Sequence, residues 1–504
     1  MQVVRPAATV TPARLAPASL KALAAVAATV MLTGSAGAAP APGPHGRADA
    51  GPACRVDLPR VRHLVLFERG TAEDAVRAEI TAACGALTGY YAEIAVAVAT
   101  STDSTFDDRL GRDRAYSAQA EGLIPAPRRV VAVLPRSVGV QSLPVAAGAA
   151  DDRSDEQWDM TMIGADQARA VQRGSNGVLV GVLDSGVDGD HPELTATVDR
   201  SASAGCVTGV PVQGAQAWRP GGAHGTHVAG IIGAADDGDG VTGVAPGVRI
   251  ASVKVVDAHG YIYPEYAVCG FMWAARRHMT IANHSYFVDP WLFTCRDVPG
   301  QSVAHEALRR AAEHATARGV LSVAAAGNEG LDLADPRVDA GSPSNTRHPQ
   351  RRSVDDRCDV LPAELPGVLT VSAVGASAVK SSYSSYGEDV VDVAAPGGDL
   401  RQRSPAAGSG CVLSTVPGGY GRMCGTSMAT PHVAGVAALA ASARPSAGPA
   451  ELAAIVLSSA TPLHCPDGTY DPDSDGRADA SCTAADAGNS FYGAGLVDAA
   501  AAVR

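Results

Sequence analysis

Short apolar runs alternate with longer stretches of helical spacing from about residue 157 to the end of this chain. A short apolar run bounded by turn residues is typical of a buried strand, and apolar residues three to four positions apart are typical of a helix. Their alternation predicts a parallel sheet with helices on both faces. The expected strands are 178–183, 250–256, 280–283, 320–326, 368–374 and 390–395, and the expected helices are 264–278, 303–318 and 433–443.

A smaller α+β unit is expected ahead of this body, over residues 60–136. Its first helix carries Val76, Ile80 and Ala83 near helical spacing. The residues on either side, 39–59 and 137–156, are rich in small, polar or proline residues and are predicted to be linkers. The expected elements of the unit are a strand at 61–67, a helix at 71–84, a strand at 91–99, a helix at 106–118 and a strand at 129–134.

The first 38 residues have the pattern of an export signal. An apolar stretch covers residues 22–32, and Ala36-Gly37-Ala38 fits a small-residue cleavage site. Three basic side chains precede the apolar stretch: Arg5, Arg14 and Lys21. The alternative is a membrane anchor, but the stretch is shorter than the roughly 20 apolar residues that a membrane span needs. The sequence therefore predicts a signal peptide over 1–38 and a secreted, extracellular protein.

Composition limits the core and the partners. The chain has 504 residues, of which 46 % are apolar but only 4 % aromatic, so Ala, Val and Leu must fill a large core. The formal net charge of −12 argues against nucleic acid as a partner.

Ten cysteines, an even number, are compatible with disulfides in an exported protein. Cys54 and Cys84 fall in the N-terminal segment, so its removal need not break a bridge to the body. No Cys-x-x-Cys occurs, so a zinc site of that kind is not expected. Sequence does not fix the connectivity; if the shortest loops close first, the pairs in the body are Cys411–Cys424, Cys465–Cys482, Cys269–Cys295 and Cys206–Cys358.

Three motifs supply groups for nucleophilic catalysis. Ser427 follows a Gly-Thr turn ahead of a helical stretch, where the positive helix end favours a developing anion. A serine needs a base and a group that orients the base. His224, in His224-Gly225-Thr226-His227, and Asp184, at the end of an apolar run, offer both groups. Each residue alone has a simpler structural interpretation, as a helix cap, a helix-start histidine or a turn residue, but the three together favour catalysis.

With these motifs in the order Asp, His, Ser, residues 157–504 resemble the subtilisin-like serine peptidases. The resemblance implies an α/β fold of three layers around a central parallel sheet, preceded by a small α+β pro-segment over 60–136. The alternative for 60–136 is a separate accessory domain. It implies that Ser427 attacks the scissile carbonyl, that His224 transfers the proton and that Asp184 orients the imidazole. His227 and His432 are expected to be structural.

The same resemblance assigns the oxyanion and substrate sites. Asn328, in Ala326-Gly327-Asn328-Glu329-Gly330, matches the oxyanion asparagine of the family; the alternative is a turn asparagine. Ser285 and Gly327 correspond to substrate-binding positions. The family usually has Ser-Leu-Gly where this chain has Ser285-Tyr286-Phe287, so the aromatic ring of Phe287 either reshapes the substrate pocket or points into the core.

Two acidic loops are candidate calcium sites, since oxygen ligands of this mix suit Ca²⁺. By resemblance, the first takes the carbonyls of Ala235, Asp239 and Val241 together with the side chains of Asp237, Gln157 and Glu193, where the family has Asp in place of Glu193. The second, with Asp471, Asp473 and Asp475, opens like an EF-hand, but its twelfth position is Cys482 in place of the bidentate Glu. The alternative in both cases is a solvated acidic loop.

The expected function is therefore a secreted serine endopeptidase, made as a precursor that processes itself within 137–156. No catalytic cofactor is expected, and Ca²⁺ is implied only as a structural ion. The expected partners are polypeptide substrates and the chain's own pro-segment as an intramolecular inhibitor, with no nucleic acid, no membrane after signal removal, and a monomeric state. Two uses stay open, general protein degradation and dedicated cutting of one partner. An esterase and a catalytically silent binding protein are the alternatives from other classes.

Overall fold

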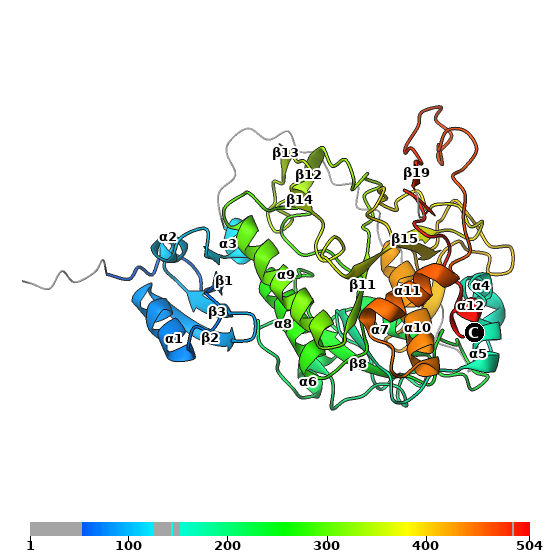
Figure 1. Ribbon diagram of the computed structural model, residues 1–504, viewed down its shortest axis with the longest axis horizontal. Helices are drawn as coiled ribbons and strands as arrows, with labels where there is room; N and C mark the ends of the chain where they lie inside the picture. The colour runs from blue at the N-terminus through cyan, green and yellow to red at the C-terminus, as the bar shows by residue number, and fades with distance from the viewer. Residues whose placement is uncertain (1–52, 124–142, 145–151, 486–487) are drawn as a thin grey trace, which may run out of the picture. The chain divides into compact units, whose positions relative to one another are not determined.

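The structure is a computed structural model of the chain, and it describes residues 53–123, 143–144, 152–485 and 488–504 (Figure 1). The chain divides into two compact units, Met1–Ala53 and Cys54–Arg504. Nearly all of the first unit lies outside the described residues. The same holds for the expected signal peptide 1–38, most of the linker 39–59 and the strand expected at 129–134.

A seven-stranded sheet, parallel in every pair, forms the centre of the second unit. Its strand order is β16-β15-β11-β9-β6-β8-β7. All six apolar runs expected as strands belong to it, so the predicted parallel α/β fold is confirmed. The strands are β6 (Leu179–Asp184), β7 (Ala204–Gly205), β8 (Arg249–Lys254), β9 (Ile281–His284), β11 (Leu321–Ala325), β15 (Val368–Val374) and β16 (Val393–Pro396).

Helices cover both faces of this sheet. On one face, α7 (His224–Gly233) and α10 (Thr426–Ala443) share a core with Val180 and Val182 of β6. On the other face, α8 (Pro264–Arg276) and α9 (Gln301–Ala317) run side by side and share a core with Leu179 and Leu183 of the same strand (Figure 1). Successive side chains of a strand point to opposite faces, so β6 supplies both cores. The result is the expected three-layer arrangement.

Residues 61–121 form a second, antiparallel sheet with the order β2-β3-β1-β4. Val65 of β1 packs with helix α1 of the same segment, whereas Leu64 and Leu66 join the core that contains α8 and α9. This period-two alternation explains how one face of the small sheet covers the two helices. The elements are β1 (Val61–Leu66), α1 (Glu73–Ala82), β2 (Gly85–Tyr91), β3 (Val96–Ser101), α2 (Phe106–Leu110), β4 (Ala115–Tyr116) and α3 (Ala118–Glu121).

The other described elements are short and lie around the main sheet. The strands are β5 (Leu143–Pro144), β10 (Thr294–Cys295), β12 (Val338–Ser342), β13 (Gln350–Ser353), β14 (Cys358–Asp359), β17 (Val412–Val416), β18 (Gly419–Met423), β19 (Ala484–Ala485) and β20 (Gly488–Asn489). The helices are the 3₁₀ turn η1 (Ser154–Glu156), α4 (Trp158–Met162), α5 (Ala165–Val171), α6 (Ala215–Trp218), α11 (Pro449–Ser459) and α12 (Ala499–Ala502). Within the described part of the chain, no helix has the length and apolar character to cross a membrane.

Two expectations for the small sheet are wrong. The strand expected at 91–99 is a turn followed by β3, because β2 ends at Tyr91 and Ala95 adopts a positive φ of 53°. The helix expected at 106–118 ends at Leu110, because Gly111 takes a φ of 96° that few other residues adopt. The chain then enters β4, which pairs with β1.

The disulfide pairs are partly as expected. Cys411–Cys424 and Cys465–Cys482 form, and Cys54–Cys84 closes within the N-terminal segment. The pairs Cys269–Cys295 and Cys206–Cys358 are wrong, because Cys206 bonds Cys269 and Cys295 bonds Cys358. The shortest-loop rule fails here because β10 pairs with β14, which places Cys295 and Cys358 opposite each other.

Candidate active site

Asp184 and His224 meet where a central strand ends and a helix begins. Asp184 is the last residue of β6, with a side chain that is 2 % exposed, and His224 is the first residue of α7. His224 Nδ1 lies 2.8 and 2.9 Å from the two carboxylate oxygens of Asp184. A carboxylate only accepts hydrogen bonds, so Nδ1 carries the proton and Nε2 is the free acceptor of the neutral ring.

Gly225 allows this close approach of strand and helix. A Cβ at this position would lie 2.5 Å from the carbonyl oxygen of Gly186 and 3.1 Å from the Cβ of Asp184. The Gly225 N–H donates to the hydroxyl of Ser185 at 3.0 Å, which satisfies one free donor of the helix start. The His-Gly pair of the motif is therefore needed for packing as well as for chemistry.

His224 is partly exposed and electrostatically tuned. Burial lowers the pKa of the imidazole, but the charge of Asp184 and its hydrogen bond outweigh this effect, and the pKa of His224 is raised above its usual 6.5. Asp184 thus stabilises the imidazolium form, which a base must reach when it takes up a proton.

Ser427 is the second residue of α10 and is partly exposed between buried neighbours. The helix begins at Thr426, earlier than the stretch at 433 from which it was expected, and it continues through Pro431. Proline has no N–H, so the carbonyl of Ser427, four residues earlier, loses its helical donor. The hydroxyl of Ser285 donates to that carbonyl at 2.9 Å and takes the place of the missing N–H.

Ser427 and His224 do not yet form a hydrogen bond. The Ser427 hydroxyl donates to the Ser285 carbonyl oxygen at 3.1 Å. Among the described residues, His224 Nε2 has no hydrogen-bond partner. Hydrogen bonds between nucleophile and base are often long without substrate and shorten when it binds, so this geometry is compatible with the expected roles.

Asn328 lies beside the start of α10 with a defined orientation. Its Oδ1 accepts the N–H of Thr426 at 2.8 Å and the Thr426 hydroxyl at 2.9 Å. These two donors fix the orientation of the amide, with its oxygen toward Thr426. The NH₂ group of Asn328 is left to donate elsewhere. The first N–H groups of a helix are also unpaired, so the Ser427 N–H and the Asn328 NH₂ can both serve an anion at this point.

The expected substrate positions lie at the ends of two adjacent strands. β9 and β11 are parallel neighbours with His284 opposite Ala324, so Ser285 and Gly327 follow corresponding strand ends. Phe287 is partly buried and packs on a cluster that includes Leu292 and Phe293. Its ring thus belongs to this cluster, which agrees with the structural alternative.

The first calcium loop does not bring its expected ligands together. Glu193 Oε1 accepts the Tyr420 hydroxyl at 2.6 Å and faces the Val241 N–H at 3.4 Å. Gln157 exchanges two hydrogen bonds with the backbone of Thr242, at 2.8 and 2.9 Å. Both side chains are therefore engaged with protein groups.

Protein atoms also fill the space inside this loop. A Cβ at Gly240 would lie 1.9 Å from the Tyr420 hydroxyl oxygen and 2.0 Å from Glu193 Oε1. Asp237 and Asp239 are exposed, and Asp237 accepts the N–H of Asp239 at 3.2 Å. Their carboxylates do not cluster with that of Glu193 in the described part of the chain. Among the described residues, Glu193 Oε2 is buried without a hydrogen-bond partner, and burial raises the pKa of Glu193. These residues do not fit a six-ligand calcium site. Ala235 is the first residue of the loop, and no ligand role is assigned to its carbonyl.

The second loop fits a cation better. Carboxylate oxygens of Asp471, Asp473 and Asp475 lie within 4.8 Å of one another. The N–H of Gly476 donates to Asp471 at 2.9 Å and lowers the pKa of that carboxyl group. The Cys465–Cys482 disulfide closes the loop. Three hard oxygen ligands are thus available, without the bidentate glutamate of an EF-hand.

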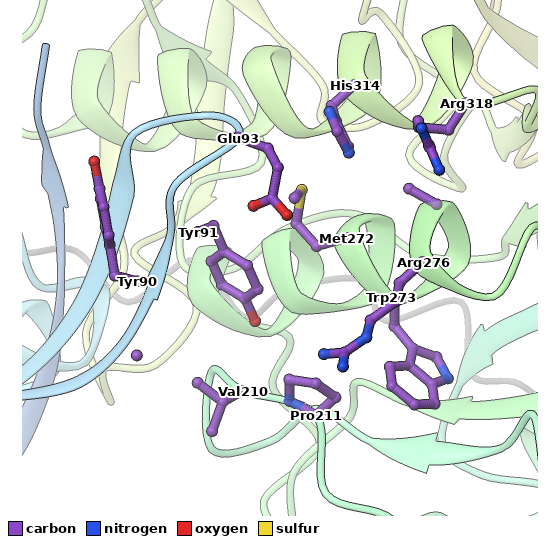
Figure 2. Close-up of a pocket in the computed structure, with 12 residues that line it drawn as sticks. Tyr90, Tyr91, Glu93, Val210, Pro211, Met272, Trp273, Arg276, His314 and Arg318 are labelled. Atoms are coloured by element: carbon purple, nitrogen blue, oxygen red, sulfur yellow. The ribbon is translucent and has the colours of Figure 1, made fainter. Parts of the chain in front are cut away.

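The cavity in Figure 2 lies away from these groups. It has a volume of about 680 Å³ and is lined by the β2–β3 turn, the loop at Val210 and helices α8 and α9. Neither Asp184, His224 nor Ser427 lines it.

Comparisons with known proteins agree with the motif assignment. The model of the subtilase family matches residues 175–495. Subtilisin NAT of Bacillus subtilis subsp. natto is 34 % identical over 333 residues, which are 66 % of this chain and 66 % of that protein. This chain thus spans slightly less than two thirds of the length of that relative.

Two solved structures extend the comparison. The epidermin leader peptide processing serine protease of Staphylococcus aureus has a TM-score of 0.63 at 18 % identity, with 88 % of this chain and 98 % of that chain covered. At this identity it shows the fold alone. A lanthipeptide protease has a TM-score of 0.52 at 26 % identity, with 69 % and 94 % covered.

Proposed function

This chain belongs to the subtilase family, and we propose that it is a secreted serine endopeptidase that hydrolyses peptide bonds through an acyl-enzyme intermediate. The observation that carries the proposal is the pairing of His224 with Asp184 at 2.8 Å, with the pKa of the imidazole raised. Ser427, at the start of a buried helix, supplies the nucleophile.

The reaction follows from these groups. His224 Nε2 takes the proton of the Ser427 hydroxyl as the oxygen attacks the scissile carbonyl carbon. The imidazolium then gives this proton to the leaving amine, and a water molecule repeats the sequence to release the acyl group. Asp184 holds the imidazole in the productive tautomer throughout.

Two donors stabilise the oxyanion of each tetrahedral intermediate. The Asn328 NH₂ group is oriented by the two Thr426 contacts to Oδ1. The Ser427 N–H, at the helix start, is the second donor. No cofactor takes part in these steps.

Residues 60–136 are proposed as the pro-segment, 137–156 as the processing linker and 157–504 as the peptidase domain. Packing of Leu64 and Leu66 against the α8–α9 core supports an inhibitor that rests on the enzyme. Arg310 of α9 also donates to the carbonyl groups of Phe67 and Ile94, at 3.1 and 3.2 Å.

Secretion and calcium belong to the same proposal. The five disulfides of the described residues favour an oxidising compartment. If a structural Ca²⁺ binds, Asp471, Asp473 and Asp475 are the side chains that would hold it. The polypeptide substrate and the pro-segment are the proposed partners of a monomeric enzyme.

The decisive test compares the secreted wild type with Ser427→Ala by size and N-terminal sequence, using mass spectrometry. We expect the wild type to begin between residues 137 and 157 and the variant to keep residues from about 39 onward. If neither is processed and neither cleaves casein or short peptides, the proposal fails.

Dedicated cutting of one partner is the second candidate use. A lanthipeptide protease of known structure is 26 % identical to this chain, which supports a dedicated use. A peptide library in which the residue before the scissile bond is varied over all residue types tests this idea. Narrow preference supports dedicated cutting, and cleavage after many residue types supports general degradation.

A further inference from the structure

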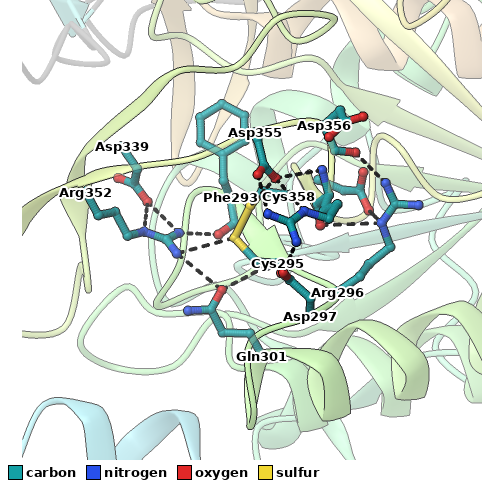
Figure 3. Close-up of a disulfide and its surroundings, with 12 residues drawn as sticks. Phe293, Cys295, Arg296, Asp297, Gln301, Asp339, Arg352, Asp355, Asp356 and Cys358 are labelled. Carbon is teal, nitrogen blue, oxygen red and sulfur yellow. Dashed lines mark hydrogen bonds and ion pairs between the residues drawn. A yellow bond between two sulfur atoms is a disulfide. The ribbon is translucent and has the colours of Figure 1, made fainter.

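Two segments far apart in sequence form a disulfide-bonded loop pair, residues 287–300 and 338–360 (Figure 3). Cys295 bonds Cys358, and the strands that carry them, β10 and β14, pair with each other. The Leu292 N–H also donates to the Ser342 hydroxyl at 2.8 Å. The loop pair is therefore held together by covalent and hydrogen bonds.

Arg352 fixes the interior of the loop pair. Its guanidinium group binds the fully buried carboxylate of Asp339 at 2.8 Å and donates to the Phe293 carbonyl, as Figure 3 shows. The same group lies 4.6 Å from the centre of the Trp291 ring. A cation over an indole face is attractive, so Arg352 holds Trp291 in place.

Trp291 then reaches the proposed pro-segment. Its indole N–H donates to the hydroxyl of Tyr116 at 2.8 Å, and Tyr116 is only 6 % exposed. The Gly300 N–H donates to the Arg112 carbonyl at 3.0 Å. The Asn345 side chain donates to the Ala118 carbonyl at 2.9 Å. Both halves of the loop pair thus bind residues 112–118.

A separate contact region of the small sheet lies at its β2–β3 turn. Glu93 in the β2–β3 turn, Met272 of α8 and His314 of α9 line a cavity of about 680 Å³ there (Figure 2). On this side the Tyr91 hydroxyl donates to the Gly209 carbonyl at 2.8 Å. This contact is separate from the hydrogen bond between Trp291 and Tyr116.

We propose that the disulfide-bonded loop pair is a second docking surface for residues 112–118, beyond helices α8 and α9. After the chain is cut, the contacts of this loop pair determine how long the N-terminal segment stays bound. The enzyme is inhibited for as long as the segment stays bound. This proposal rests on the proposed role of residues 60–136 as an inhibitor.

Docking is tested first in the uncut, full-length Ser427→Ala chain. Trp291→Phe removes the indole N–H and keeps an aromatic ring under Arg352. Amide hydrogen exchange measured by mass spectrometry should become about tenfold faster in residues 112–118, because the buried Tyr116 hydroxyl loses the hydrogen bond from Trp291. Exchange in residues 85–101 should stay the same. If residues 112–118 exchange at the same rate with and without Trp291→Phe, the docking proposal is wrong, even if the proposed function is correct.

Inhibition is tested in the active chain. The measured quantity is the lag, which is the time between the appearance of the cut chain and the onset of hydrolysis of a short peptide. We expect Trp291→Phe and Tyr116→Phe each to shorten the lag about tenfold. The double variant should be no faster than either single one, because both remove the same hydrogen bond. The final rate should not change.

Two controls separate this contact from a general weakening. Tyr90→Phe removes a hydroxyl that bonds Thr71 within the N-terminal segment, and its lag should match the wild type. Tyr91→Phe removes the separate contact to Gly209, and its effect should add to that of Trp291→Phe. If cutting and hydrolysis occur but Trp291→Phe keeps the wild-type lag, the docking proposal fails. If neither cutting nor hydrolysis occurs, the proposed function fails.

Discussion

Ser285 donates its hydroxyl to the carbonyl of Ser427 at 2.9 Å, and the Ser427 hydroxyl donates back to the Ser285 carbonyl at 3.1 Å. The first of these bonds exists because Pro431 cannot donate to that carbonyl within the helix. The strand-end serine and the helix proline therefore act together to hold the turn that carries the proposed nucleophile.

Ser285→Ala should lower kcat about tenfold, because the partly buried Ser427 carbonyl loses its donor and the turn relaxes. Pro431→Ala in the same chain should restore much of the loss, because the alanine introduced there has an N–H that can bond to the Ser427 carbonyl. Steady-state kinetics on a short peptide measure both. Ser442→Ala, which removes a serine from the same helix, should leave kcat unchanged. Absence of rescue by Pro431→Ala would contradict the argument.

The orientation of Asn328 leads to a graded prediction. Asn328→Leu removes an oxyanion donor and should lower kcat by about 10²–10³, the size known for a subtilisin, with little change in KM. Thr426→Val keeps the backbone donor to Oδ1 but removes the hydroxyl at 2.9 Å, and should cost about tenfold. A larger loss for Thr426→Val than for Asn328→Leu would show that Thr426 has another role.

The pH dependence follows from the pairing of His224 with Asp184. A protonated imidazole cannot accept the serine proton, so activity is lost as pH falls through the pKa of His224. Since this pKa is raised, the acidic limb of kcat/KM should lie above pH 6.5. In Asp184→Asn on a Ser427→Ala background, burial alone remains and the pKa should fall, as an NMR titration of the ring can measure. An activity optimum near pH 4 would contradict the assignment of His224 as the base.

The main sheet and the strand-end position of Asp184 were predictable from the sequence. Strands buried on both faces are apolar runs, and six of the seven strands have this pattern, whereas β7 has only two residues. Parallel strands gather their carboxyl ends at one edge, and Asp184 and the residues after β9 and β11 follow such strand ends. The order of the motifs then predicted the roles of Asp184, His224 and Ser427, and these roles remain proposals.

Contacts made by tertiary packing were not predictable in this way. The bond between Cys206 and Cys269 depends on where α8 crosses the sheet, which no local pattern records. The filling of the first calcium loop depends on Tyr420, far along the chain from Glu193. A turn glycine, Gly111, was the one signal that could have ended the helix expected at 106–118.

The filled loop predicts that calcium does not order residues 235–241. Hydrogen exchange of this segment in Ser427→Ala should be the same with EDTA and with millimolar Ca²⁺, because Gln157 and Glu193 are engaged by protein donors. Tyr420→Phe should speed exchange there by roughly tenfold, because it removes the hydrogen bond to Glu193. Residues 471–476 serve as the internal comparison, since any calcium effect is expected in that loop. Protection of 235–241 by Ca²⁺ in the unmodified loop would contradict the conclusion that these residues do not form a calcium site.

Lys380 is buried among aromatic rings. It is 1 % exposed, and its ammonium nitrogen lies 5.0–5.4 Å from the ring centres of Tyr386, Tyr470 and Phe491. Burial lowers the pKa of Lys380 to about 7, although the charges of Asp399 and Asp479 act in the opposite direction. Folding therefore favours the neutral amine over the ammonium form.

The free energy of unfolding should depend on pH through this lysine. The unfolded lysine titrates near 10.5 and the folded one near 7, so the cost of burying it is absent above about pH 10.5, grows as pH falls and is complete below about pH 7. Lys380→Met keeps the length of the side chain without the charge, and should raise Tm by about 5 °C at pH 6. The gain should shrink at pH 9.5. Thermal unfolding by circular dichroism on the Ser427→Ala background measures both values without self-digestion. As a control, Lys254→Met, at the surface, should change Tm little at either pH. An equal Tm gain for Lys380→Met at pH 6 and 9.5 would mean that packing, and not the burial of charge, determines the cost.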